Sequence, residues 1–139
     1  MSTVIRPEIS EKNKYWIDKH RYYELKHFCL QYKEWKKAYA ACNESIIFAS
    51  SMEEHRSSNT MSDITAKYAI KRAYYAGRIK LVEKAAMDAE PDLYLYILKA
   101  VTEGLSYTYL KTKLEIPCGR DMYYDRYRKF FWLLSNSRD

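Results

Sequence analysis

The sequence predicts an all-α protein of about five helices: a long N-terminal helix, a central helix and a C-terminal module of three short helices. The 139 residues contain only three glycines and three prolines, which is too few for the turns of a β-hairpin protein. Apolar and aromatic residues make up 47% of the chain, enough for a hydrophobic core. Over long stretches these residues recur every three or four positions, the spacing of an amphipathic helix.

The first helical pattern runs from about residue 13 to 48, within an N-terminal region that spans 1–49. Its apolar residues follow one another at alternating spacings of three and four, which places them on one seam of a helix. The seam could pack on the rest of the protein or mediate self-association as in a short coiled coil, and the first interpretation is favoured because large rings fill coiled-coil interfaces poorly. The residues of the seam are Leu25, Phe28, Tyr32, Trp35, Tyr39, Cys42 and Ile46.

A Ser-rich polar stretch, 50–63, shows no periodicity and is predicted to be a linker or loop. A central connecting helix is expected next, within 64–91. It begins at Ile64, after a cap at Thr60 or Asp63, and ends near Ala89. Because this pattern is apolar on two sides, the helix should contact two neighbours.

Segment 92–139 predicts three short helices with tight joints, over 92–103, 107–114 and about 120–134. Pro91 suits the opening of a helix, Gly104 is a typical C-terminal stop, and Ser106 is a typical N-cap. The turn between the second and third helices falls at 116–119. Short helices joined in this way, the last of them rich in Arg, Lys and Tyr, are typical of a helix-turn-helix module.

The stretch GLSYTYLKTKLEIP resembles the helix-turn-helix of sigma-factor region 4, with its Gly-x-Ser-Tyr opening followed by Leu110, Leu114 and Ile116. Glu115 stands where glycine is common in that motif. In architecture the whole chain resembles the RinA/ArpU family of phage late-gene transcription activators, in which an aromatic N-terminal helix with a QY-x-x-W type segment leads through a polar linker to a sigma-like module. The resemblance implies a DNA-binding regulator with RNA polymerase as a possible partner.

A helix-turn-helix of this kind should meet duplex DNA with its last two helices. The helix over 107–114 is expected to contact phosphates, and the helix that starts at Arg120 is expected to read base edges from the face that carries Tyr124. An aromatic protein-binding surface is the alternative interpretation of the same residues. The candidate DNA-binding residues are Ser106, Tyr107, Lys111, Lys113, Arg120, Tyr124, Arg126, Arg128 and Lys129.

The composition and the absence of certain motifs argue against several classes of protein. Three cysteines and a polar N-terminus indicate a reducing cytoplasm, and no apolar run is long enough to cross a membrane. The chain lacks phosphate-loop, CxxC, HExxH and nucleophile-elbow motifs, so we expect neither an enzyme nor a cofactor. His20 and His27 lie too far apart along the chain to suggest a zinc site.

The net charge of +6 suits a polyanionic partner, but ordinary solubility charge would look the same. The sequence therefore leads to the hypothesis of a cytoplasmic, phage-type transcriptional regulator that binds duplex DNA, with a possible homodimer formed by its N-terminal helix. The alternative hypothesis is a phage-encoded inhibitor or adaptor that binds a host protein, such as a nuclease or RNA polymerase, through its basic, Tyr-rich surface.

Overall fold

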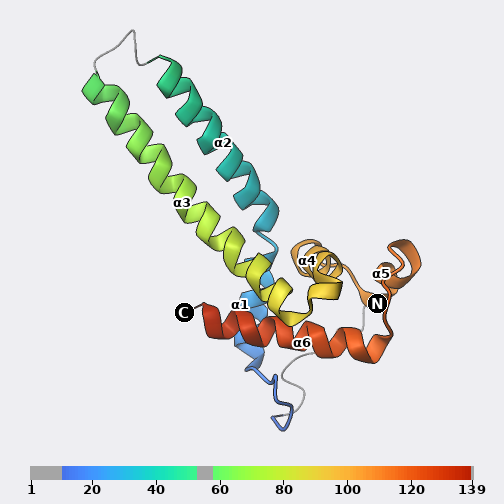
Figure 1. Ribbon diagram of the computed structural model, residues 1–139. Helices are drawn as coiled ribbons and strands as arrows, with labels where there is room; N and C mark the ends of the chain where they lie inside the picture. Colours follow the sequence, from blue (N-terminus) through green and yellow to red (C-terminus); the bar gives the residue numbers. More distant parts are fainter. Residues whose placement is uncertain (1–10, 53–57, 139) are drawn as a thin grey trace. The chain divides into compact units, whose positions relative to one another are not determined.

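A computed structural model describes residues 11–52 and 58–138, and this part of the chain is helical without any strand. Its α-helices are α1 (Lys19–Cys29), α2 (Tyr32–Ser51), α3 (Ser58–Ala89), α4 (Tyr94–Glu103), α5 (Tyr107–Lys113) and α6 (Arg120–Ser137) (Figure 1). A 3-10 turn, η3 (Pro91–Leu93), precedes α4. The all-α fold class predicted from the sequence is confirmed.

The chain divides into two compact units. The first, here called the head, comprises the residues up to Gln31 and those from Leu81 onward. The second, here called the hairpin, spans Tyr32–Lys80 and consists of α2 and the first two thirds of α3 running side by side in opposite directions (Figure 1). Helix α3 thus supplies residues to both units.

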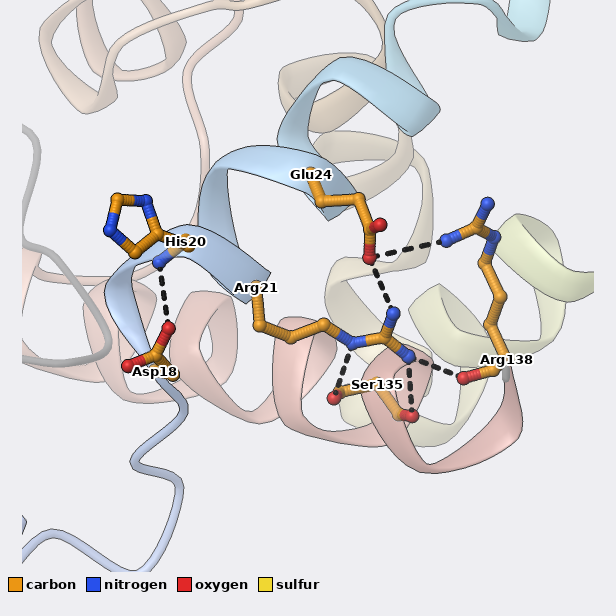
Figure 2. Close-up of polar contacts among 6 residues, drawn as sticks. All are labelled: Asp18, His20, Arg21, Glu24, Ser135 and Arg138. Atoms are coloured by element: carbon orange, nitrogen blue, oxygen red, sulfur yellow. Dashed lines mark hydrogen bonds and ion pairs between the residues drawn. The ribbon is translucent and has the colours of Figure 1, made fainter.

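The long N-terminal helix expected over 13–48 is two helices, α1 and α2, and this prediction is wrong in that respect. Leu30 ends α1 with its backbone N–H donating to the carbonyl of Lys26, and the N–H of Gln31 donates to the carbonyl of Phe28. Asp18 caps the start of α1 by accepting a hydrogen bond from the N–H of His20, 3.0 Å away (Figure 2). The apolar seam continues across the break, so its periodicity does not reveal it.

The predicted linker over 50–63 is also shorter than expected. Helix α2 extends to Ser51 and α3 begins at Ser58, six residues before the expected start at Ile64. The polar residues at 58–63 are therefore helical, and the rest of the predicted linker, over 53–57, lies outside the described residues.

The core of the head lies between α1 and α6, and the rings of these two helices interlock there. The Tyr22 ring meets the Phe131 ring edge-on with centroids 5.1 Å apart, and the Tyr127 ring meets Phe131 in the same way at 5.0 Å. Helix α4 adds buried Ile97 and Val101, and the last turns of α3 add a row of small residues, Val82, Ala85, Ala86 and Ala89. Edge-to-face ring pairs stabilise such a core beyond the burial of their area.

Arg21 fastens the end of α6 to α1 (Figure 2). Its Nε donates to the Ser135 hydroxyl at 3.1 Å, and its Nη2 donates to the Ser135 carbonyl at 3.0 Å and to the Arg138 carbonyl. Glu24 pairs with Arg21 at 2.5 Å and with Arg138 at 3.5 Å. The fork of one guanidinium thus satisfies carbonyls that the end of a helix leaves without an intrahelical partner.

The hairpin is held by a seam of α2 residues and by polar contacts between its helices. Trp35, Cys42 and Ala49 are buried, and the Arg78 guanidinium lies 5.8 Å from the Trp35 ring centroid. The Arg72 side chain donates to the Asn43 amide oxygen at 2.7 Å. In the described part of the chain, no helix is long and apolar enough to cross a membrane.

Candidate nucleic-acid interface

Helix α5 is the most exposed helix of the head, and its sequence explains why. Tyr107 and Leu110 are buried at helical spacing, which leaves the rest of this short helix to solvent. Gly104 ends α4 in the left-handed conformation with φ 70°, and three residues after the end of α4 the Ser106 hydroxyl accepts the N–H of Tyr109 at 3.2 Å to start α5. The exposed residues of α5 are Thr108, Tyr109, Lys111, Thr112 and Lys113.

Two of the candidate DNA-binding residues serve the fold. The Ser106 side chain is the N-cap of α5. Tyr107 is buried, and its hydroxyl donates to the Cys118 carbonyl at 2.8 Å, across the turn that leads to α6. Both residues therefore fix the position of α5 against the start of α6.

That turn contains a left-handed residue that is not glycine. Glu115 has φ 55°, at the position where the sigma-like motif commonly has glycine. The following residue, Ile116, is fully buried, and its N–H donates to the Leu110 carbonyl at 3.0 Å. The reversal at Glu115 thus returns the chain to the core before α6 begins.

Arg120, at the first position of α6, is exposed beside α5. Its guanidinium lies 5.2 Å from the centroid of the Tyr107 ring, a cation–π arrangement that orients the side chain without neutralising its charge. Lys111 and Lys113 are exposed on α5, and we refer to these two lysines and Arg120 together as the basic face. No ion pair neutralises these three residues within the described part of the chain.

Tyr124 does not lie on an open face of α6, which corrects the placement expected from the sequence. Its side chain is only 6% exposed. It packs in a cluster of rings, with the Tyr123 centroid at 5.3 Å, the Tyr107 centroid at 6.2 Å and the Tyr127 centroid at 6.4 Å. Tyr124 therefore belongs to the side of α6 that packs in the core of the head, together with Tyr123 and Tyr127.

Arg126 is committed to ion pairs. Its Nε donates to the Glu90 carboxylate at 2.8 Å, and it also binds the adjacent Asp125. The hydrogen bond from Arg126 lowers the pKa of Glu90, and the same bond raises the pKa of the Arg126 guanidinium. This pair joins α6 to the end of α3, so Arg126 has a structural task.

The other two candidates on α6 are half-buried. The Nε atom of Arg128 is buried and has no hydrogen-bond partner in the described part of the chain, and the charge of Lys129 contributes to the low pKa of Glu90. Of the nine candidates, the structure thus leaves Lys111 and Lys113 of α5 and Arg120 at the start of α6 exposed and, within the described part of the chain, free of ion pairs. Thr108, Tyr109 and Thr112 are exposed on α5 but are not among the nine candidates expected from the sequence, although their helical spacing from buried Leu110 indicates an exposed position.

No group of three or more His, Cys, Asp or Glu side chains that could hold a metal ion occurs among the described residues. Cys29, which follows His20 and His27 on α1, is fully buried, and this burial raises the pKa of its thiol. Burial also raises the pKa of the Cys118 thiol. Neither environment stabilises the thiolate that metal binding or nucleophilic attack requires.

Comparisons of the chain with protein-family models, with curated proteins and with solved structures find no match.

Proposed function

We propose that this protein is a sequence-specific regulator of transcription, of the phage type, that binds duplex DNA through the basic face of its head. The observation that supports this most is the basic face itself: Lys111 and Lys113 on α5 and Arg120 at the start of α6 are exposed and, within the described part of the chain, form no ion pair. Unpaired cations at such a site release counterions from a phosphate backbone when they bind it. The regulatory role rests on the resemblance of residues 104–116 to sigma region 4.

In this proposal α5, rather than α6, enters the major groove. A helix in the groove needs side chains free over about half of its circumference. Helix α5 leaves five of its seven residues exposed. Helix α6 leaves five of its eighteen residues exposed and buries six large side chains in the core of the head. The three-residue joint from Gly104 to Ser106 is the turn of the helix-turn-helix, with α4 as its first helix.

The roles within the basic face differ by chemistry. Lys111 and Lys113 are flexible point charges that suit phosphate oxygens. Arg120 is oriented by the Tyr107 ring and has the planar fork that can bind the two acceptors of a guanine edge. Thr108 offers a hydroxyl and a methyl group to the base edges of the major groove. Thr112 offers its methyl group, because its hydroxyl already donates to the Thr108 carbonyl at 2.8 Å.

Fluorescence anisotropy with duplex DNA, measured at several salt concentrations, tests the proposal. Sequences enriched from a random pool by the parent protein would serve as the preferred site. Lys113→Ala should weaken binding to all duplexes alike and reduce the salt slope by about 1. Arg120→Ala should cost about 1–3 kcal/mol on the preferred site and less on random DNA.

Lys84→Ala is the control, because it removes the same charge from a side chain of the head that is 70% exposed on α3, where it pairs with Asp88 at 2.6 Å. It should leave DNA binding unchanged. The proposal is wrong if the parent protein shows no salt-dependent affinity for duplex DNA, or if Lys84→Ala weakens binding as much as Lys113→Ala. A protein-binding adaptor would then be the better hypothesis.

A further inference from the structure

The hairpin has an apolar groove that has no part in the DNA binding proposed for the head. The groove lies between α2 and α3, has a volume of about 480 Å³ and is open to solvent. Phe48 stands on its rim with 67% of its surface exposed. Six of the side chains that line it are Ala41, Glu44, Phe48, Met52, Ile64 and Tyr68.

Two helices alone do not cover the apolar residues that they turn toward each other. Helix α2 buries four side chains, whereas none of the side chains described over 63–80 of α3 is buried. Ile64, Tyr68, Tyr75 and Ile79 all remain partly exposed. In a regular four-helix bundle each helix has neighbours on two sides, so packing two hairpins together would cover these side chains.

We propose that a second copy of this chain covers the groove, so that two hairpins form a four-helix bundle. Such an interface is isologous, meaning that the same patch of both copies meets across a two-fold axis. The hydrogen bond between α2 and α3 shows which residues of the two helices lie at the same level along the hairpin. Because Arg72 on α3 binds Asn43 on α2, their neighbours Lys71 and Glu44 lie at the same level along the hairpin.

A two-fold axis parallel to the hairpin places α2 of one copy over α3 of the other, without any shift along the helices. Glu44 of each copy then faces Lys71 of the other. Glu44 lines the groove, and the Lys71 ammonium lies 5.9 Å from the ring centroid of Tyr68, which also lines it. Both side chains are exposed, and neither forms an ion pair within the described part of the chain.

The interface therefore combines apolar burial with two symmetric ion pairs. It differs from self-association through the seam of Trp35 and Cys42, because those residues are already buried inside the hairpin. Nucleic acid would meet the carboxylate of Glu44 in this groove, which disfavours it as the occupant.

Sedimentation equilibrium of the full chain over a concentration series tests the proposal. The parent protein should reach the mass of a dimer. Phe48→Glu should remain monomeric, with its helix content unchanged by circular dichroism, because it places a charge on the apolar rim that the second copy would cover. Ile70→Glu is the matched control: Ile70 is an equally exposed apolar residue of the hairpin (72%) that does not line the groove, so this variant should still dimerise.

A charge exchange tests the two-fold arrangement itself. Glu44→Lys and Lys71→Glu should each weaken dimerisation, roughly tenfold, since each change places like charges together twice per dimer. The double variant Glu44→Lys/Lys71→Glu should restore dimerisation. A monomeric parent protein, with or without DNA, would overturn the proposal, as would an equal effect of Ile70→Glu or a double variant no better than the single ones.

Discussion

The hydroxyl groups of Tyr22 and Tyr127 lie 2.7 Å apart in the core of the head, where they join α1 to α6. Both side chains are buried, with exposed fractions of 1% and 8%. The two residues are 105 positions apart in the sequence, so their hydrogen bond records the long-range packing of the first helix on the last. A polar pair in such a place is stabilising only while both partners are present.

Tyr22→Phe should therefore destabilise the protein by about 1–3 kcal/mol, because the Tyr127 hydroxyl remains buried without that partner. The double variant Tyr22→Phe/Tyr127→Phe should cost less than the sum of the two single changes. Denaturant unfolding of the four proteins measures this coupling. Tyr23→Phe, at a half-buried neighbour, should have little effect, and strictly additive single changes would contradict the prediction.

Alkaline pH should unfold the head earlier than a typical helical protein. Burial raises the pKa of Tyr123 and that of Tyr127, so both phenols stay protonated in the folded protein at a pH where the unfolded chain ionises them. The unfolded state then binds fewer protons, and stability falls as the pH rises above about 10. Below that pH these two groups should leave stability unchanged.

Urea unfolding between pH 8 and pH 11 measures this dependence. Each buried phenol should contribute a loss of up to about 1.4 kcal/mol per pH unit above the pKa of the unfolded chain. Tyr127→Phe should show a shallower decline than the parent protein. A stability that does not change between pH 10 and pH 11 would rule out this account of the tyrosine cluster.

Glu115→Gly should stabilise the protein by up to about 1 kcal/mol. Glu115 holds a left-handed backbone conformation, with φ 55°, that costs a side-chain-bearing residue roughly 1–2 kcal/mol, and the larger entropy of glycine in the unfolded chain offsets part of the gain. Thermal unfolding gives the comparison. Gly104→Ala should have the opposite effect and destabilise the protein, because Gly104 has a φ of 70° that alanine adopts only with strain. Space is not the cause, since an added Cβ would lie 3.7 Å from Cδ2 of Leu30. If Glu115→Gly destabilises the turn, the left-handed conformation is not a source of strain.

Trp35→Ala should cost about 3–5 kcal/mol of stability, as expected when a large buried ring is removed. Trp35 is 4% exposed in the hairpin, beneath the Arg78 guanidinium. Hydrogen exchange should show the loss of protection concentrated in α2 and in the first part of α3. Lys36→Ala, one residue along and exposed, is the control and should be close to neutral. An unchanged stability of Trp35→Ala would mean that the seam does not hold the hairpin together.

Local signals in the sequence determined the helical class and the joints of the C-terminal module. Pro91, Gly104 and Ser106 act through the backbone conformation and hydrogen bonds of their own turns, which depend little on distant residues. These residues could therefore be placed at helix ends from the sequence. The start of α6 at Arg120 was also placed from the sequence, although Gly119 precedes it without a side-chain cap.

Tertiary structure decided where the first helix breaks and which faces are covered. The seam from Leu25 to Cys42 keeps one helical period across the break at Leu30 and Gln31, so no local pattern shows that α1 belongs to the head and α2 to the hairpin. The sequence alone does not distinguish an exposed from a buried position for Tyr124, because tyrosine is suited both to an interface and to a core. Its burial depends on rings from α5 and on other turns of α6 that pack around it. The sequence by itself thus determined the helical class and the joints of the C-terminal module, because these depend on local backbone chemistry. Packing between distant segments decided where the first helix breaks and that Lys111, Lys113 and Arg120 are the candidate basic residues left exposed.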